Sequence, residues 1–216
     1  MENKLHDYRK SYEKASLVRE NLDENPIQQF RTWFYDVEKA GGLDEANAMT
    51  VSTIGGDGFP KSRIVLLKSY DENGFVFYTN YDSEKGKALQ NNPKTCLSFF
   101  WPNTERQVII KGTAEMVDEN VSDNYFASRP KGSQLGALVS NQSNVIKNRQ
   151  VLEDELASLE SKYENREVPR PKNWGGFLVV PESIEFWQGR PNRLHDRFVF
   201  TKKESELDWN IERLAP

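Results

Sequence analysis

The pattern of apolar and polar residues predicts four helices. After Asn25-Pro26, which suits the first positions of a helix, apolar residues recur at helical spacing until Gly41-Gly42. Further helices are expected at 118–128, at 145–163 and, with Ser83 as its N-cap, at 83–92. The helix at 145–163 has an apolar stripe that suits packing in a core or between subunits, formed by Leu152, Leu156, Leu159 and Tyr163.

Short apolar or alternating runs between turn-forming sequences predict at least seven strands. These strands are expected at residues 48–54, 62–69, 75–79, 95–101, 107–116, 177–180, 184–187, 197–201 and 209–213. So many short strands with inserted helices favour a mainly β fold with added helices (α+β). We expect the sheet to close into a barrel.

Composition narrows the class of protein. The chain has 216 residues, 37% of them hydrophobic and 29% charged, which is typical of a soluble globular protein. No apolar run approaches the ~20 residues of a membrane span, and the N-terminus has no signal-peptide pattern. Cys96 cannot form an internal disulfide, so we expect a buried thiol in a reducing, cytoplasmic compartment. Two histidines and one cysteine predict no metal site, and a net charge of −4 argues against broad nucleic-acid binding.

The segment Trp187-Gln-Gly-Arg-Pro-Asn-Arg-Leu-His-Asp-Arg197 combines three arginines with one of the two histidines. If residues 193–200 are extended, Arg193, His195 and Arg197 share one face. Cationic groups at that spacing repel one another unless an electron-rich group lies among them. The sequence therefore favours a binding site here, and a solvated edge strand is the alternative.

Two further segments have anion-binding chemistry. Arg63 and Lys68 bracket an apolar run and, five residues apart, should face opposite sides of a regular strand unless a bulge intervenes. Two ligands, or two ends of one ligand, fit this arrangement, whereas the alternative is a core strand with basic ends. The helix that begins after Ser83 brings free N–H groups and Lys85 together, which suits a phosphate. Glu84 is expected to face solvent because it would oppose a bound anion.

A third group lies near 125–133. Tyr125 and Arg129 share a helix face, and Ser133 follows in the next turn or loop. Together they offer several donors to a phosphate, although an ordinary basic helix end is the alternative. Gln107, Gln142 and Ser143 are neutral groups that could hydrogen-bond polar ring edges.

Taken together, these segments resemble the pyridoxamine 5'-phosphate oxidase family. The resemblance covers nearly the whole chain, from Arg9-Lys-Ser-Tyr12 to Arg213-Leu-Ala-Pro216. Its most specific parts are Arg63-Ile-Val-Leu-Leu-Lys68, Phe77-Tyr-Thr-Asn80, Glu105-Arg-Gln-Val108, Ser128-Arg-Pro-Lys-Gly-Ser-Gln-Leu-Gly-Ala137, Trp174-Gly-Gly-Phe177 and Glu185-Phe-Trp-Gln-Gly-Arg-Pro-Asn-Arg-Leu-His-Asp-Arg197.

The resemblance implies a split β-barrel homodimer with FMN at the subunit interface. It implies a single FMN-binding domain at 21–216 and a flexible N-terminal segment, 1–20, that closes over the active site. The implied reaction oxidises pyridoxamine or pyridoxine 5'-phosphate to pyridoxal 5'-phosphate, with O2 as acceptor and H2O2 as product.

By the same resemblance, residues divide into three sets. The FMN contacts would be Arg63, Ile64, Val65, Leu66, Lys68, Tyr78, Thr79, Lys85, Gln107, Gln142, Ser143, Trp187 and Arg197. The substrate contacts would be Arg9, Lys10, Ser11, Tyr12, Lys68, Tyr125, Arg129, Ser133, Arg193, Leu194 and His195. The catalytic residues would be Arg193 and His195.

One position departs from the family pattern, because Glu84 stands where many relatives carry arginine at the FMN-phosphate helix. Two rival functions remain. One is a split-barrel protein that binds FMN, haem or another flavin-like cofactor without this reaction, which would not need the substrate set. The other is a barrel that binds single-stranded nucleic acid, which the acidic net charge disfavours.

Overall fold

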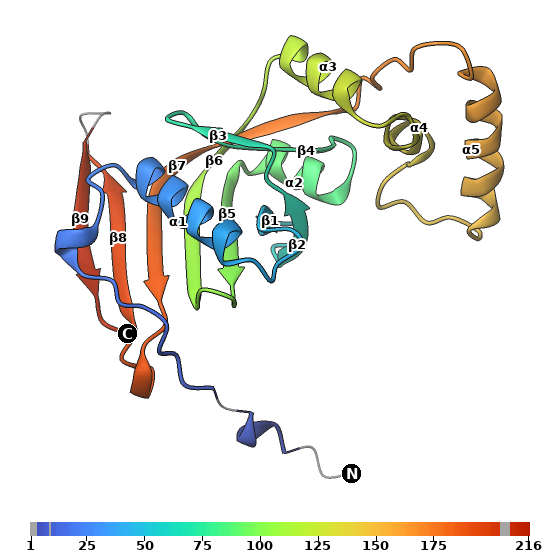
Figure 1. Ribbon diagram of the computed structural model, residues 1–216. Helices are drawn as coiled ribbons and strands as arrows, with labels where there is room; N and C mark the ends of the chain where they lie inside the picture. The colour runs from blue at the N-terminus through green and yellow to red at the C-terminus, as the bar shows by residue number, and fades with distance from the viewer. Residues whose placement is uncertain (1–3, 9, 204–207) are drawn as a thin grey trace. The chain divides into compact units, whose positions relative to one another are not determined.

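The computed structural model describes residues 4–8, 10–203 and 208–216, so Arg9 lies outside the described residues. The helices are α1 (Pro26–Ala40), α2 (Glu84–Asn91), α3 (Glu119–Ser128), α4 (Lys131–Val139) and α5 (Gln150–Lys162), with short 3-10 turns at Leu5–Asp7, Arg19–Asn21 and Pro191–Arg193. The strands are β1 (Ala48–Ile54), β2 (Pro60–Leu66), β3 (Ser69–Asp71), β4 (Gly74–Asn80), β5 (Lys94–Trp101), β6 (Arg106–Met116), β7 (Trp174–Gln188), β8 (Asp196–Lys202) and β9 (Trp209–Leu214) (Figure 1).

Contacts along the chain define two compact units. The first unit comprises residues 1–50, 96–111 and 181–216, and the second comprises residues 51–95 and 112–180. Within the described residues, no helix combines the length and apolar character that crossing a membrane requires.

The strands follow the order β2-β1-β5-β6-β7-β4-β3, with β8 paired to β7 and β9 paired to β8. This path has ends at β2 and β3 in the described part of the chain, so the sheet is not the closed barrel expected from the strand pattern, whereas the mainly β, split-barrel fold implied by the resemblance is confirmed. The long strand β7 takes part in both halves of this path. Its first half pairs with β4 and its second half pairs with β8, and Pro181, which has no N–H to donate, lies between the two halves.

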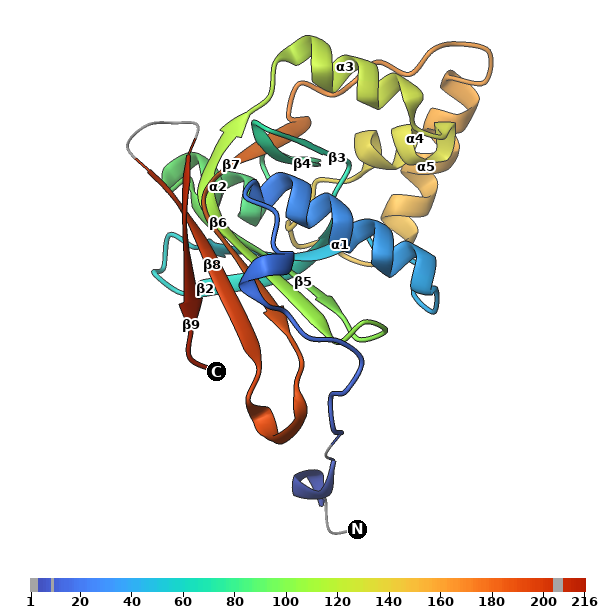
Figure 2. The same cartoon turned by 60° about the vertical axis from the view of Figure 1, so that its left-hand side comes forward.

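In the first unit, α1 begins where the sequence predicts. The Asn25 side chain accepts hydrogen bonds from the backbone N–H groups of Ile27 and Gln28, at 2.7 and 3.2 Å. The helix then buries Phe30 and Trp33, whose rings contact those of Phe99 and Phe186 at centroid distances of 5.2 and 5.1 Å. In the same unit, β8 and β9 run side by side (Figure 2).

In the second unit, α2 is held tightly against the end of β4. Ser83 accepts a hydrogen bond from the N–H of Gly86 at 3.2 Å, as expected for an N-cap. A Cβ at Gly86 would lie 2.3 Å from the carbonyl oxygen of Tyr81, so only glycine permits this approach. The helix N-terminus is thereby placed beside the last residues of β4.

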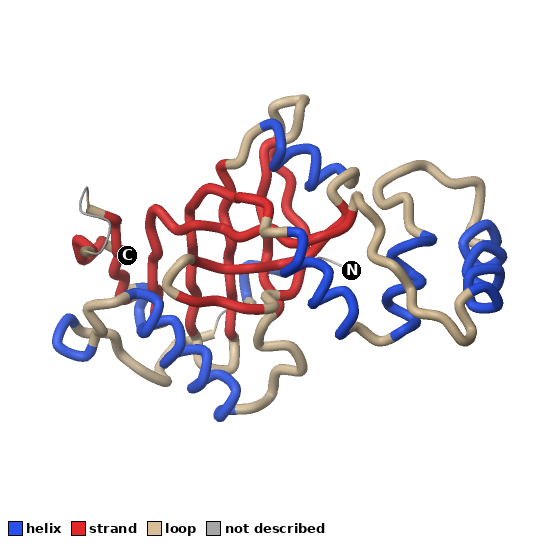
Figure 3. The backbone as a smooth tube through the Cα atoms, turned by 90° about the horizontal axis from the view of Figure 1, so that it is seen from above, coloured by secondary structure: helices blue, strands red, loops and turns tan. Residues whose placement is uncertain are grey.

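The second unit also has its own small core. Phe126, Leu135, Val168 and Trp174 are buried together. Leu156, Leu159 and Tyr163 pack against this cluster, which confirms the predicted core role for these members of the stripe. The same packing places α4 beside α5 (Figure 3).

Several predicted boundaries are wrong, each for a local reason. The helix expected from 145 begins at Gln150, just after Asn148, whose side chain accepts a hydrogen bond from the Val151 N–H at 3.3 Å. Helix α4 was not predicted, since its two glycines weaken the helical signal, and Ser133 lies within it rather than in a loop. Cys96 is half-buried rather than buried, and burial raises the pKa of its thiol.

Candidate active site

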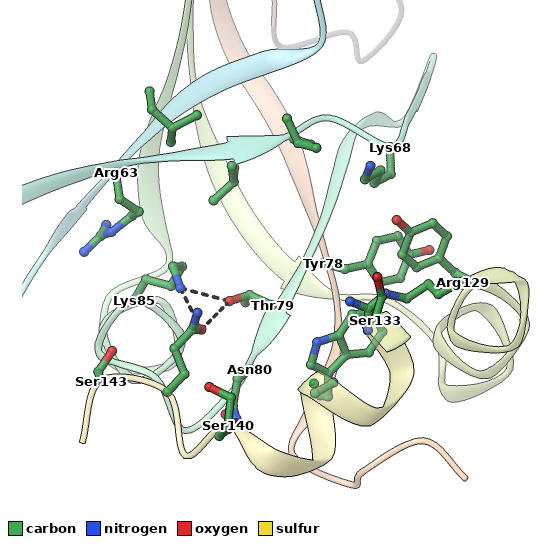
Figure 4. A pocket seen from close by; sticks show the side chains of 18 of the residues that line it. Arg63, Lys68, Tyr78, Thr79, Asn80, Lys85, Arg129, Ser133, Ser140 and Ser143 are labelled. Carbon is green, nitrogen blue, oxygen red and sulfur yellow. Dashed lines mark hydrogen bonds between the residues drawn. The ribbon is translucent and has the colours of Figure 1, made fainter. Parts of the chain in front are cut away.

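The second unit contains a cavity of about 930 Å³ (Figure 4). This volume lies within the range of roughly 300–1,000 Å³ that is usual for cofactor and ligand pockets. The lining includes every residue of this unit that the sequence assigned to FMN or substrate: Arg63, Ile64, Val65, Leu66, Lys68, Tyr78, Thr79, Lys85, Tyr125, Arg129, Ser133, Gln142 and Ser143.

One end of the cavity is organised by Lys85, in the first turn of α2. Its Nζ donates to Thr79 Oγ1 at 3.1 Å and to Gln142 Oε1 at 2.9 Å (Figure 4). The pKa of Lys85 is lowered to about 8, first by burial and then by the charge of Arg63, against an opposing effect of Glu84. A buried ammonium at a helix N-terminus is therefore poorly compensated within the protein and is suited to an anion.

Arg63 stands at the same end. Its Nη1 donates to Thr53 Oγ1 at 2.8 Å and to the Val51 carbonyl at 3.3 Å. Burial lowers the pKa of its guanidinium, and Glu84 partly offsets this. Glu84 is exposed and forms an ion pair with Lys61, as expected for a residue that faces solvent, but it also borders the cavity near Arg63 and Lys85.

The expectation that Arg63 and Lys68 face opposite sides is wrong, because both line the cavity (Figure 4). The physical reason is that β2 ends at Leu66 instead of 69, so the alternation of a strand does not extend to Lys68. The Lys68 backbone instead donates to the Val76 carbonyl at 2.9 Å, beside β4.

The other end of the cavity has a stack of three aromatic rings. The centre of the Tyr78 ring lies 3.8 Å from the centre of the Tyr125 ring and 5.5 Å from that of Trp174, with interplanar angles of 18° and 13°. The Arg129 guanidinium lies 4.6 Å from the centre of the Trp174 ring. Trp174 is a lining residue that was not assigned to the site from sequence, although it begins the Trp-Gly-Gly-Phe motif.

Arg129 carries an unsatisfied donor. Its Nη1 is buried and has no hydrogen-bond acceptor among the described residues, and burial lowers the pKa of the guanidinium. Ser133 of α4 and Lys68 line the same cavity. Because a buried donor without an acceptor is costly, this donor set fits an anionic group such as a phosphate.

A second cluster of predicted residues lies in the first unit. The Tyr12 ring meets Trp187 edge-on at 5.7 Å and lies 6.0 Å from His195, and His195 lies 4.6 Å from Trp187. His195 Nδ1 accepts a hydrogen bond from the Arg190 backbone at 3.1 Å, which leaves the proton of the neutral ring on Nε2. Burial and then the charge of Arg193 lower the pKa of His195, whereas Asp196 raises it.

Arg193, His195 and Arg197 do not share a strand face, which corrects the geometry expected from sequence. Residues Pro191–Arg193 form a 3-10 turn in which Asn192 and Arg193 have φ of 57° and 62°, and β8 begins only at Asp196. Proline at the start of the segment and asparagine in the left-handed region favour a turn over an extended chain.

Arg197 lies within β8 and has partners of its own. Its Nε donates to Glu185 Oε1 at 2.8 Å and its Nη1 donates to the Ala215 carbonyl at 2.9 Å. The hydrogen bond to Glu185 raises the pKa of Arg197. Trp187 lies directly opposite Arg197 in the ladder between β7 and β8.

The other predicted residues of the first unit are accounted for as follows. Gln107 is half-buried in β6, Leu194 is 67% exposed, and Lys10 and Ser11 are exposed. The structure thus brings one group of predicted residues together around the cavity and a second, Tyr12, Trp187 and Arg193, around His195.

Comparisons with known proteins agree along the whole chain. Residues 38–163 match the sequence model of the family described as pyridoxamine 5'-phosphate oxidase, and residues 174–216 match the pyridoxine 5'-phosphate oxidase C-terminal dimerisation region. A pyridoxine/pyridoxamine 5'-phosphate oxidase of Flavobacterium johnsoniae is 61% identical over 213 residues, covering 99% of each chain. One of Christiangramia forsetii is 54% identical over the full length of both chains.

Solved structures show the same fold. The crystal structure of PhzG from Burkholderia lata 383, in complex with tetrahydrophenazine-1-carboxylic acid, has a TM-score of 0.87 at 25% identity, covering 94% of this chain and 100% of that chain. A pyridoxamine 5'-phosphate oxidase-related, FMN-binding protein of Nostoc punctiforme has a TM-score of 0.69 at 16% identity, covering 90% of this chain and 100% of that chain.

Proposed function

The chain belongs to the pyridoxamine 5'-phosphate oxidase family, and we propose that it is an FMN-dependent enzyme that oxidises pyridoxamine or pyridoxine 5'-phosphate to pyridoxal 5'-phosphate. O2 accepts the electrons and H2O2 is released, and the amine substrate also consumes water and releases ammonia. The observation that carries the proposal is the full-length identity to such oxidases, together with a cavity that has separate cationic groups at its two ends.

The residues of the Lys85 end would hold the phosphate of FMN. Arg63, Lys85 and the N-terminus of α2 supply positive charge and N–H donors there. Ile64, Val65 and Leu66, from β2, offer apolar contacts and backbone groups, and Tyr78, Thr79, Gln142 and Ser143 would complete the pocket. When bound, FMN supplies an acceptor for the hydride equivalent that leaves the substrate at C4'.

The other end would hold the substrate phosphate. Lys68, Tyr125, Arg129 and Ser133 line it, and the buried Nη1 of Arg129 has a donor to give. A phosphate that accepts from Arg129 would relieve the cost of that unsatisfied donor. Two phosphate groups, one of FMN and one of substrate, thus account for the two cationic ends.

The His195 cluster would act at the reacting end of the substrate. Arg193 and His195 are the proposed catalytic residues, with the Nε2–H of a neutral His195 as a hydrogen-bond donor toward the substituents at C4'. The segment 1–20 would close over a single FMN-binding domain at 21–216. In the closed state the substrate would also contact Lys10, Ser11, Tyr12 and Leu194. Gln107, Trp187 and Arg197 would contact FMN, Arg197 by favouring negative charge on the reduced ring.

Membership of the family also indicates the oligomeric state of the protein. Residues 174–216 match the family's dimerisation region. We infer a homodimer with FMN held where the two copies meet, so that both copies contribute contacts. A half-buried Cys96 with a raised pKa and no second cysteine suits the reducing cytoplasm, where we place the enzyme.

The test starts with an absorbance spectrum and the sedimentation of the purified protein. A yellow dimer with one FMN per chain is expected, and added pyridoxamine 5'-phosphate should yield pyridoxal 5'-phosphate and peroxide in equal amounts. A colourless monomer that takes up no FMN would contradict the proposal. A yellow protein that produces no peroxide would instead support the rival flavin-binding role.

A further inference from the structure

Glu105 is a buried carboxylate that the reaction described above does not use. It lies in the turn between β5 and β6, and its side chain is 2% exposed. Its φ of 58° is in the left-handed region, which a glutamate adopts only when its surroundings hold it there. A charged, buried group in a strained turn needs partners that repay its desolvation.

Those partners come from the N-terminal segment. One oxygen of Glu105 accepts hydrogen bonds from the backbone N–H groups of Glu13, at 2.8 Å, and Lys14, at 3.0 Å. Its other oxygen lies 3.5 Å from Lys10 Nζ. Burial by itself would raise the pKa of Glu105, but the backbone hydrogen bonds and the charge of Lys10 lower it, so the carboxylate stays ionised.

The tethered residues flank Tyr12. The Glu105 carboxylate holds Lys10 on one side of Tyr12 and Glu13 and Lys14 on the other. The Tyr12 ring itself contacts the rings of Trp187 and His195. Gly189 leaves room for this ring, because a Cβ there would lie 2.7 Å from Tyr12 Cγ. The backbone carbonyl of Glu105 also accepts from Gly189 N–H at 2.8 Å, so the same residue holds both sides of this contact.

We propose that Glu105 is a positioning residue that fastens the N-terminal segment through residues 10, 13 and 14 and thereby holds Tyr12 against Trp187 and His195. It touches neither substrate nor cofactor, and it acts through Tyr12. The consequence for catalysis rests on the proposed function, whereas the tether itself is a property of the folded chain.

The direct test is hydrogen exchange of the FMN-loaded protein, measured by mass spectrometry on peptides that cover residues 10–17. Glu105→Gln keeps the volume of the side chain but removes its negative charge and one of its two acceptor oxygens. Hydrogen exchange of the amides of residues 10–17 should therefore become about tenfold faster. Asp36→Asn is the matched control, because it breaks the neighbouring ion pair of Asp36 with Arg106 at 2.8 Å and leaves the tether intact. Unchanged exchange in Glu105→Gln would overturn the proposal.

Kinetics then test whether the tether acts through Tyr12. Glu105→Gln should raise the KM for pyridoxamine 5'-phosphate about fivefold to tenfold with FMN content unchanged, and should have less than a twofold effect in a Tyr12→Ala background. Equal effects in both backgrounds would show that Glu105 does not work through Tyr12.

If Glu105→Gln fails to fold, Lys10→Met loosens the same tether from an exposed position. Hydrogen exchange of the amides of residues 13 and 14 should then become about twofold to threefold faster. Exchange of these amides at the wild-type rate would count against the tether. A wild-type protein without turnover would contradict the proposed function but leave the exchange result valid.

Discussion

The guanidinium of Arg129 lies 4.6 Å from the ring centre of Trp174, and Trp174 in turn stacks with Tyr78 and Tyr125. The aromatic stack therefore supports the one buried guanidinium nitrogen that finds no acceptor among the described residues. An indole face attracts a cation without consuming any of its hydrogen-bond donors. Arg129 is thus held in place while its donors remain available to a ligand.

Replacing Arg129 by alanine should weaken substrate binding without releasing the cofactor. A charge-assisted hydrogen bond to phosphate contributes about 1.5–3 kcal/mol, so the KM for pyridoxamine 5'-phosphate should rise by roughly one to two orders of magnitude. Steady-state kinetics and the FMN absorbance of the purified variant check this. Loss of flavin with unchanged KM would mean that Arg129 serves the other ligand.

Replacing Trp174 by phenylalanine should have a smaller effect of the same kind. Phenylalanine keeps a ring but has a weaker attraction for cations, a difference of about 0.5–1 kcal/mol, so the KM should rise about twofold to fivefold while the FMN content stays constant. Trp209→Phe, on β9, is the control and should leave the KM unchanged. An unchanged KM in Trp174→Phe would show that the stack does not support Arg129.

FMN affinity should depend on pH through Lys85. Its lowered pKa of about 8 means that it is charged below that pH and neutral above it in the protein without ligand. A bound phosphate favours the charged form of Lys85 and raises its pKa, so above pH 8 the binding of FMN takes up a proton. The affinity for FMN should therefore fall as pH rises above 8, by at most about tenfold per pH unit.

Flavin fluorescence titrations at several pH values measure this dependence. Lys85→Met should bind FMN more weakly and lose the alkaline dependence, whereas Lys87→Met, on the exposed side of the same helix, should behave as wild type. An alkaline dependence that persists in Lys85→Met would assign it to another group.

His195 should work as a neutral hydrogen-bond donor. Its pKa is lowered from the ordinary 6.5, so kcat/KM should stay level as pH falls through 6.5 and decrease only below the lowered value. Glutamine can place an amide nitrogen near the position of Nε2, whereas asparagine mimics Nδ1. His195→Gln should therefore retain about tenfold more kcat/KM than His195→Asn, and the reverse order would show that Nδ1 faces the substrate.

Arg193 and Arg197 should have separable roles, because one lies in a turn and the other in β8. Arg193→Leu should reduce kcat while the flavin spectrum stays normal. Arg197→Leu should weaken flavin binding or shift its spectrum, and it also leaves Glu185 without this partner. Spectra and turnover of both variants decide the matter, and equal loss of FMN in both would contradict the division. Arg193→Lys should retain little of the wild-type kcat, because an ammonium group cannot reproduce the planar, forked hydrogen bonding of a guanidinium.

The sequence alone determined the features that depend on neighbouring residues. The capped start of α1 at Asn25-Pro26 and of α2 at Ser83 could be predicted, since an N-cap acts within one turn. Most strands could be predicted from alternation and turns. The residue types of the cavity could also be chosen from sequence, because arginine, lysine and serine are the side chains that bind phosphate wherever the fold places them.

Only the tertiary structure decided which of these residues meet. Arg63 and Lys68 line one cavity because β2 ends early beside β4, and Arg193 leaves the face of His195 because the chain turns at Pro191. Trp174 under Arg129 and Glu105 beneath residues 13 and 14 are contacts between distant parts of the chain. Such contacts arise from packing and strand pairing over long sequence separations, and no local pattern of residues encodes them.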